Sequence, residues 1–316
     1  MNAALSVRDL TLTIGGASVV DGIGFDVGPG EVMALVGESG CGKSLTALAA
    51  MRLLPRAVTR ARGVVELAGS DLYARPEREV RRLRGRKISM IFQEPLAALD
   101  PLASVGAQVA EATGLRGGAA RQAVLAMLEE VGISDPTRRI AQYPFELSGG
   151  MAQRVMIATA LVSRPDVLIA DEPTTALDVT IQAQILDLLR RLAAGRGTAI
   201  LLITHDMGVV ADIADRVGVM YAGRIAETGR TEQVFARPRH PYTALLLAAL
   251  PRLTDTPKSD LAVIAGQVPL PNHFPPGCRF ADRCKLASDR CRAEQPPLRD
   301  MGEGQLAACW HAEQVG

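Results

Sequence analysis

The chain has 316 residues, with 35 basic and 34 acidic side chains and 3% aromatic residues. This length favours two domains over one and allows a large buried core. The balance of charge excludes a global basic field for nucleic acid, and the scarcity of aromatic side chains disfavours base stacking. No apolar run approaches the ~20 residues of a membrane span, and the N-terminus lacks a secretory signal. We therefore expect a cytoplasmic protein that could still dock on a membrane partner.

The first predicted elements surround one glycine-rich segment. Residues 10–14 and 23–27 alternate apolar and polar side chains, which is typical of half-exposed antiparallel strands. Residues 32–36 predict a buried strand, and residues 45–51 are good helix formers. Between them, residues 37–44 read Gly-Glu-Ser-Gly-Cys-Gly-Lys-Ser and fit the phosphate-binding loop, or P-loop. The position of this motif between a strand and a helix is the context that makes it credible.

The P-loop sequence has a direct chemical interpretation. Its glycines let backbone N–H groups point at phosphate oxygens, and the helix N-terminus adds partial positive charge. Lys43 would reach the β- and γ-phosphates, and the hydroxyl of Ser44 would bind Mg²⁺. Cys41, at a variable position near the helix N-terminus, is expected to have a reactive thiol. The candidate nucleotide-binding residues here are Gly37, Glu38, Ser39, Gly40, Cys41, Gly42, Lys43 and Ser44.

The middle of the chain alternates between short apolar runs and helical patterns. Strands are predicted over 63–67, 88–92, 167–170, 199–204, 217–221 and 224–227, the last two as a hairpin around Gly223. Helices are predicted over 105–112, 119–131, 151–162, 180–192, 207–214 and 244–250, whereas the charged segment 77–86 favours a solvated helix or loop. This alternation predicts a largely parallel α/β sheet with a helical insert from about 95 to 162.

Polar side chains that follow predicted strands favour nucleotide hydrolysis. Asp171 and Glu172 end a buried strand, so one carboxylate could bind the Mg²⁺ of Ser44 while the other polarises a water. Gln93 ends another strand and could sense metal or water, although a plain surface glutamine is the simpler interpretation. His205 closes a further strand, at the edge where such sheets carry phosphate chemistry.

One further segment, Leu147-Ser148-Gly149-Gly150-Met151-Ala152-Gln153, resembles the signature sequence of ATP-binding cassette (ABC) ATPases. The order of motifs is similar to that family over roughly residues 5–229: P-loop, Gln93, signature, Asp171-Glu172, Ala176-Leu177-Asp178 and His205. The resemblance implies an α/β P-loop NTPase fold of ABC type, with an antiparallel β subdomain and a helical insert. One departure is Ile14, which stands where many family members stack an aromatic side chain on adenine.

The same resemblance implies an ATP site shared by two cassettes. ATP and Mg²⁺ on the P-loop of one cassette would be completed by Ser148, Gly149 and Gly150 of the other, and a helix N-terminus with two glycines suits a phosphate. The resemblance also implies that Glu172 is the general base and that Asp171 and Gln93 join Ser44 at the metal. It further implies that His205 holds the γ-phosphate and that Asp178 links the two sites.

Within the family, the sequence is most similar to the ATPase subunits of dipeptide and oligopeptide importers. The similarity lies in residues 155–158 and 170–180, and especially in Arg239-His240-Pro241-Tyr242-Thr243. This His-Pro-Tyr segment is interpreted as a helix cap and a family marker, not a catalytic site. The alternatives are a nickel importer ATPase of the same type and a soluble ABC ATPase acting on DNA or ribosomes. The last would need a coiled-coil insertion, a duplicated cassette or a basic arm, and the sequence has none.

The resemblance also implies an organisation and a set of partners. We expect an ABC ATP-binding domain over 1–235 and a peptide-importer-type extension over 236–316. The partners are a second ABC ATPase subunit (a paralogue in preference to a second copy), two membrane permeases and an extracytoplasmic solute-binding protein, with no nucleic acid. The chain would then be peripheral, at the cytoplasmic face of the cell membrane.

Four of the five cysteines lie in the proline-rich tail that starts at Pro257: Cys278, Cys284, Cys291 and Cys309. In a cytoplasmic protein such a group argues for metal rather than disulfides. The spacing does not name the metal, because four thiolates suit either Zn²⁺ or an iron–sulfur cluster, and free thiols are the third possibility. Resemblance to peptide importers with this tail implies a [4Fe–4S] cluster. ATP binding is expected to survive replacement of any one of these cysteines by serine, because the P-loop domain has its own buried strands.

Overall fold

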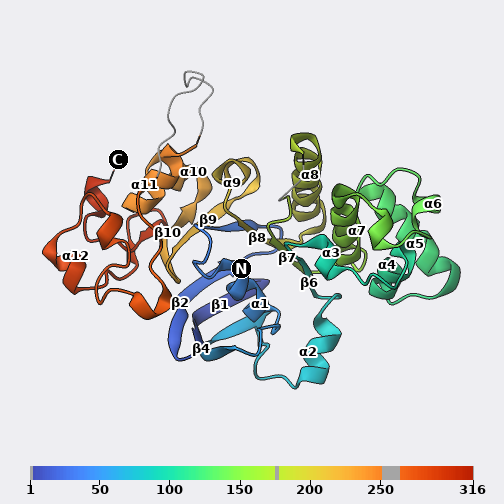
Figure 1. Cartoon of the computed structure of the whole chain (residues 1–316), viewed down its shortest axis with the longest axis horizontal. Helices are drawn as coiled ribbons and strands as arrows, with labels where there is room; N and C mark the ends of the chain where they lie inside the picture. The colour runs from blue at the N-terminus through green and yellow to red at the C-terminus, as the bar shows by residue number, and fades with distance from the viewer. Residues whose placement is uncertain (1–2, 175–177, 251–263, 316) are drawn as a thin grey trace. The chain divides into compact units, whose positions relative to one another are not determined.

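The computed structural model describes residues 3–174, 178–250 and 264–315 (Figure 1). The Ala176-Leu177 part of one predicted motif lies outside these residues, as does Pro257, where the proline-rich tail starts. The chain divides into two compact units. Unit 1 comprises Met1–Leu5, Val27–Glu31 and Leu67–Ile203, and unit 2 comprises Ser6–Asp26, Val32–Glu66 and Thr204–Gly316.

Unit 2 contains a sheet built outward from the strand that precedes the P-loop. β3 (Val32–Val36) pairs in parallel with β9 (Arg216–Tyr221), which pairs antiparallel with β10 (Arg224–Arg230) in the predicted hairpin. Beyond β10 come β12 (Leu306–Ala307) and β11 (Arg299–Asp300), both antiparallel. Every residue of β3 is buried, as its apolar run predicted. The C-terminal tail therefore joins the same sheet as β3, although its sequence has no strand periodicity.

A second sheet of unit 2 has the strand order β2-β1-β4. β1 (Leu5–Ile14) and β2 (Ala17–Val27) meet at the Gly15-Gly16 turn, where both glycines have positive φ, and β4 is Val58–Leu67. These strands are longer than predicted. In β1 the polar–apolar alternation is interrupted at Asp9, which has a φ of 47°, so the sequence pattern identifies only the second half of the strand.

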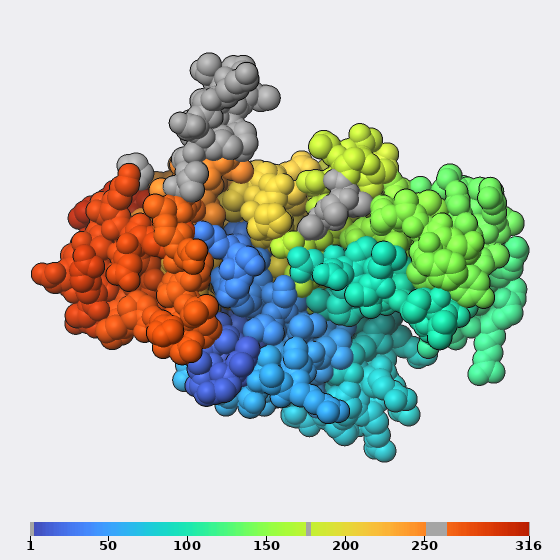
Figure 2. Space-filling model, viewed as in Figure 1, coloured from blue at the N-terminus to red at the C-terminus, as the bar shows by residue number. Residues whose placement is uncertain are grey.

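The helices of unit 2 are α1 (Lys43–Ala50), α9 (Met207–Ile213), α10 (Thr231–Ala236), α11 (Pro241–Ala248) and α12 (Asp289–Ala293). Short 3₁₀ turns are η2 (Pro271–His273), η3 (Ala281–Arg283) and η4 (Ala312–Gln314). The buried core of β3 and β9 includes Tyr242 and Phe280 from the extension. Figure 2 shows the orange residues of the extension packed against blue residues of the N-terminal strands. The predicted domain boundary at 235/236 falls inside α10 and stays a prediction.

Unit 1 contains three parallel strands in the order β8-β7-β6. They are β6 (Ile88–Ile91), β7 (Val167–Asp171) and β8 (Ala199–Thr204), and all their residues are buried. Continuous apolar strands are typical of parallel sheets that are covered on both faces. Asp171 ends β7 opposite Ile203, so the acidic pair leaves the sheet at its carboxyl edge, as predicted.

The remaining elements of unit 1 are β5 (Ser70–Asp71) and helices, and Figure 1 gathers α4 to α7 into one green group. The helices are α2 (Glu77–Leu83), α3 (Pro95–Ala98), α4 (Val105–Thr113), α5 (Gly117–Glu130), α6 (Pro136–Arg139), the 3₁₀ turn η1 (Pro144–Glu146), α7 (Gly149–Leu161) and α8 (Val179–Arg196). The predicted helical insert between 95 and 162 contains helices and no strand. Among the described residues, no helix has the length and apolar character of a membrane span.

Candidate nucleotide-binding site

The P-loop of unit 2 connects β3 to α1 and wraps around the ammonium group of Lys43. Nζ of Lys43 donates to the carbonyls of Gly37 at 2.7 Å and Glu38 at 3.1 Å, and the side chain is only 6% exposed. Gly42, at the N-cap of α1, has a φ of 100°. A lysine ammonium at the N-terminus of a helix, in a glycine-rich loop, is the arrangement that binds phosphate oxygens.

Two glycines of the loop are required by their surroundings. A Cβ on Gly37 would lie 2.2 Å from the carbonyl oxygen of Met220, and one on Gly42 would lie 2.7 Å from Cγ2 of Val20. Both residues also have positive φ, which side chains disfavour. The loop is therefore shaped by contact with β2 and β9 as well as by its own sequence.

The prediction that Cys41 is unusually reactive is wrong. Its thiol is fully buried, and burial raises its pKa despite the nearby positive charge of Lys43, whose Nζ lies 3.7 Å from Sγ. A reactive cysteine needs its thiolate form and access to solvent, and Cys41 has neither. Proximity to a helix N-terminus did not decide this pKa, because desolvation has the larger effect.

Two contacts to the P-loop come from residues that sequence reasoning did not assign to the site. The hydroxyl of Tyr242 accepts a hydrogen bond from the backbone N–H of Glu38, and Arg283 forms an ion pair with the Glu38 carboxylate. Tyr242 belongs to the His-Pro-Tyr segment, which was interpreted only as a cap and a marker. The cap itself is confirmed, since Nδ1 of His240 accepts from the N–H of Tyr242 at 3.1 Å.

In unit 1 the structure brings together two residues that were predicted separately. Nε2 of Gln93 donates to Oε2 of Glu172 at 3.2 Å, so the glutamine is exposed but has a carboxylate partner. Asp171 is buried at the end of β7, and Glu172 turns out of the strand with a φ of 48°. Positive φ at a glutamate is a strained conformation of the kind that clusters at functional sites.

The signature segment lies at the N-terminus of α7 in unit 1. Ser148 is the N-cap, its hydroxyl accepts from the N–H of Met151 at 3.4 Å, and both Ser148 and Gly149 are exposed. The start of the helix is thus exposed to solvent, a favourable place for an anion. The buried side chain of Gln153, one turn along, donates to the carbonyl of Pro173 at 2.6 Å. Sequence reasoning missed this link between the signature helix and the loop after Glu172.

Asp178 and His205 are the remaining predicted site residues, and both are exposed. Asp178 is exposed and caps α8, where its Oδ1 accepts from the N–H of Ile181 at 2.9 Å. His205 is exposed after Thr204, and Asp206 beside it caps α9. Ile14, the residue in place of an aromatic, is 40% exposed at the end of β1. These positions are accessible to a ligand, but they do not identify one.

Comparison with known proteins gives the family. The ABC transporter family matches residues 20–175, and the family described as "Oligopeptide/dipeptide transporter, C-terminal region" matches residues 226–291. A "Probable peptide ABC transporter ATP-binding protein" of Sinorhizobium fredii is 48% identical over 98% of this chain and 96% of its own length. This chain belongs to the ABC transporter family of ATP-binding proteins. The "Dipeptide transport ATP-binding protein DppD" of Bacillus subtilis is 46% identical over 99% of this chain and 96% of its own length.

Solved ABC structures share the fold. The dimeric structure of a bacterial ABC transporter cassette superposes with a TM-score of 0.65 at 25% identity, over 72% of this chain and 98% of that one. The structure of cbiO1 from Clostridium perfringens, described as part of the ABC transporter complex cbiONQ, gives a TM-score of 0.64 at 29% identity, over 75% of this chain and 92% of that one. The predicted α/β P-loop NTPase fold of ABC type and the ATPase class are therefore confirmed.

The four tail cysteines of this ABC ATPase gather in one region of unit 2. The N–H of Cys278 donates to the carbonyl of Cys291 at 2.7 Å, and all the cysteines are free thiols. Burial, reinforced by the other tail thiols, raises the pKa of Cys278 and of Cys309 to about 11. The N–H of His311 donates to Sγ of Cys309 at 3.3 Å.

This arrangement does not amount to a metal site. Within the described parts of the chain, no group of three or more His, Cys, Asp or Glu side chains is placed to hold a metal ion. The predicted metal ligands Cys278, Cys284, Cys291 and Cys309 are thus neighbours without a ligand geometry. Neither the structure nor the comparisons support the iron–sulfur or zinc prediction.

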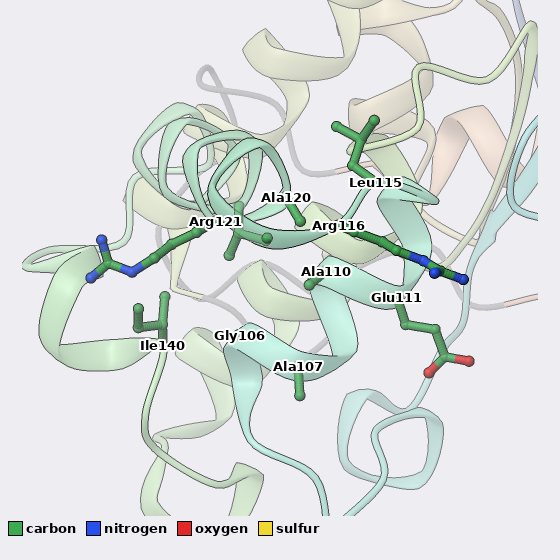
Figure 3. A pocket seen from close by; sticks show the side chains of 11 residues that line it. Gly106, Ala107, Ala110, Glu111, Leu115, Arg116, Ala120, Arg121 and Ile140 are labelled. Carbon is green, nitrogen blue, oxygen red and sulfur yellow. The ribbon is translucent and has the colours of Figure 1, made fainter.

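Unit 1 also contains a cavity of about 510 Å³ (Figure 3). It lies among α4, α5 and Ile140, and its charged lining residues include Glu111, Arg116 and Arg121. Figure 3 shows Arg116 and Arg121 extending in opposite directions, so they do not converge on one anion. None of the predicted nucleotide-binding residues lines this cavity.

Proposed function

We propose that this chain is the ATP-hydrolysing subunit of a membrane importer for dipeptides or oligopeptides. The observation that carries the proposal is the presence, in one chain, of a complete P-loop and the oligopeptide/dipeptide transporter C-terminal region. The names of its relatives in Sinorhizobium fredii and Bacillus subtilis support peptides over nickel as the cargo. They also favour a transporter subunit over a soluble ABC ATPase.

Each predicted site residue has a proposed role in hydrolysis. In unit 2, the N–H groups of the P-loop and Lys43 bind the ATP phosphates, and Ser44 binds Mg²⁺. In unit 1, Asp171 is a further ligand for the metal, and Glu172 takes the proton of the attacking water. The hydrogen bond between Gln93 and Glu172 supports this assignment, because it fixes the orientation of the base. His205 would contact the γ-phosphate.

The remaining residues have proposed roles in a pair of cassettes. Ser148, Gly149 and Gly150 would bind the phosphates of ATP held on the partner cassette, because the N-terminus of α7 is exposed in the single chain. Asp178 would contact the partner. We propose a paralogous ATPase as that partner, with two permeases and a solute-binding protein. The assembly would place this chain at the cytoplasmic face of the cell membrane.

We also propose that Cys278, Cys284, Cys291 and Cys309 hold a [4Fe–4S] cluster, with Zn²⁺ as the alternative. The proposal rests on the resemblance to peptide importers with this tail; the described residues themselves show no ligand geometry. Such a cluster would stabilise the fold of the tail and needs no redox role. Metal analysis of anaerobically purified protein tests this: about four irons with matching sulfide is expected. One zinc per chain and no iron would indicate a zinc site in place of the cluster. If the protein contained no metal, the proposed metal site would be refuted.

The hydrolytic assignment is tested with two substitutions. Glu172→Gln should bind MgATP with unchanged affinity and lose hydrolysis by roughly 10²–10⁴-fold, because the water loses its general base. Lys43→Ala should lose binding as well as turnover. Phosphate release and calorimetric MgATP binding measure the two properties. If Glu172→Gln kept most of the hydrolysis rate, Glu172 would not be the base.

The cargo is tested in the assembled importer. In membranes that contain the permeases and both ATPases, the solute-binding protein loaded with a dipeptide or oligopeptide should stimulate ATP hydrolysis. The Glu172→Gln complex is the matched control for ATPase activity from other sources. If only a nickel-loaded binding protein stimulated ATP hydrolysis, the result would favour the nickel importer. If the chain copurified with ribosomes and not with permeases, the result would favour a soluble ATPase.

A further inference from the structure

The second residue of the P-loop, Glu38, is held by two side chains of the C-terminal extension. Oη of Tyr242 accepts from the backbone N–H of Glu38 at 2.8 Å. Nη1 and Nη2 of Arg283 lie 2.6 and 2.9 Å from the two carboxylate oxygens of Glu38, in a bidentate ion pair. These partners follow Glu38 by 204 and 245 residues, and they fix both its main chain and its side chain.

The two holding side chains are themselves fixed by packing. Tyr242 has no exposed surface, and its ring meets that of Tyr221 edge-on at 4.7 Å between centroids. The side chain of Arg283 is 5% exposed, and its guanidinium also donates to Oη of Tyr221 and the carbonyl of Ile264, both at 3.2 Å. Phe280, fully enclosed, contacts both tyrosine rings. An arginine fork held in this way loses little entropy on pairing with Glu38.

A second chain of contacts reaches the far side of the P-loop. Arg279, also in the extension, donates to the carbonyl of Ala222 and pairs with Asp21 at 2.5 Å. The next residue, Gly223, donates its N–H to the carbonyl of Cys41 at 3.1 Å. The extension therefore supports the loop at Glu38 directly and at Cys41 through the β9–β10 turn.

We propose that Tyr242 and Arg283 are positioning residues that hold the P-loop in its phosphate-binding conformation. The inference rests on the proposed function, in which this loop binds ATP. The carbonyls of Gly37 and Glu38 hold the ammonium of Lys43, so rotation of Glu38 would displace both the lysine and the N–H groups of the loop. Because a glycine-rich loop is flexible, fixing it in advance lowers the entropy cost of binding nucleotide. The His-Pro-Tyr segment then acts on the ATP site as well as capping α11.

The test uses the full-length chain and measures the Kd for MgATP together with the melting temperature without nucleotide. Tyr242→Phe and Arg283→Gln should each weaken MgATP binding roughly tenfold, since each removes a contact that fixes Glu38. In the assembled ATPase they should raise KM more than they lower kcat. Arg290→Gln is the matched control, because it removes a positive charge from the same extension, where Arg290 contacts Glu294 and Trp310.

A double-mutant cycle separates positioning from general destabilisation. Adding Glu38→Gln to Arg283→Gln should cost little more than either change alone, because both remove the same ion pair. Additive losses, wild-type affinity in Tyr242→Phe and Arg283→Gln, or an equal loss in Arg290→Gln would overturn the inference. If Arg283→Gln fails to fold, Tyr242→Phe, which removes one oxygen atom, decides alone. A wild-type chain that does not bind MgATP, or a Lys43→Ala variant that binds it normally, would instead refute the proposed function.

Discussion

The imidazole of His240 is 3% exposed and caps α11 through Nδ1. Its backbone N–H donates to the buried carboxylate of Glu227 at 2.9 Å, and its ring lies 5.7 Å from that of Phe280. Burial lowers the pKa of His240 to about 4, because the charged form would lose its hydration. The neutral ring is also the form whose Nδ1 can accept the capping hydrogen bond.

This pKa predicts a loss of stability in mild acid. Between pH 6.5 and about 4 the unfolded chain binds a proton on His240 that the folded chain does not, so stability falls as the pH falls through this window. The full effect is on the order of 3 kcal/mol. His240→Asn keeps an acceptor for the cap without titrating, so it should flatten the dependence of melting temperature on pH.

The comparison with His240→Asn also controls for Glu227. Burial raises the pKa of that carboxyl group, so its contribution has the opposite sign and is lost as the pH rises. Because Glu227 is present in both proteins, the difference between their melting curves isolates the histidine. Equal slopes in the two proteins would show that His240 titrates normally in the folded chain.

At the scale of elements, the tail is a part of unit 2 and not an appendage. β12 pairs with β10, and Gln305 next to it donates to Glu227 at 2.7 Å and to the carbonyl of Arg237 at 3.0 Å. The 3₁₀ turn η3 carries Arg283 to the P-loop, and Cys284 follows directly. Cys284 and the residue that contacts Glu38 are therefore consecutive in the chain.

This connection changes the expected effect of replacing a tail cysteine. Sequence analysis predicts that ATP binding survives such a change, whereas the structure makes Cys284 the neighbour of a P-loop contact. We expect Cys284→Ser to make the tail more sensitive to protease and also to weaken MgATP binding severalfold, by disturbing Arg283. Limited proteolysis and calorimetry measure the two effects. Normal affinity in a protease-sensitive variant would show that the tail and the P-loop are independent.

At the scale of the whole molecule, the exposed N-terminus of α7 bears on the proposed pairing with a second cassette. Gly149 begins this helix, and a Cβ placed on it would meet no atom within 4 Å. Its small size is therefore not required by packing within the described chain. A close approach by the partner cassette or its bound phosphate would explain the glycine.

Substitutions at the start of α7 should separate binding from turnover. Gly149→Ala and Ser148→Arg should leave the MgATP affinity of the isolated chain within about twofold, because Lys43 and the P-loop hold the phosphates. In the assembled importer both should reduce ATP hydrolysis strongly, the arginine more than the alanine. Parallel losses of affinity and activity in the isolated chain would argue against a site completed by a second cassette.

The order of the elements and the candidate nucleotide-binding residues could be predicted from the sequence because they depend on local patterns. An apolar run, a glycine-rich loop and a following helix former are consecutive, so β3, the P-loop and α1 are encoded within residues 32–51. The signature and the Asp171-Glu172 pair are similarly local. Strand ends were less certain, as in β1, because a residue with positive φ interrupts the alternation.

Tertiary structure alone decided which distant residues reach the P-loop. Tyr242 and Arg283 contact Glu38 across more than half the chain, and no periodicity or motif encodes such a pairing. Burial, which depends on the packing of several elements, also decided that the thiol of Cys41 is unreactive and that His240 is neutral. The sequence thus determined the fold and the candidate residues of the ATP site by local pattern. Long-range packing decided the protonation of Cys41 and His240 and the contacts that hold the P-loop.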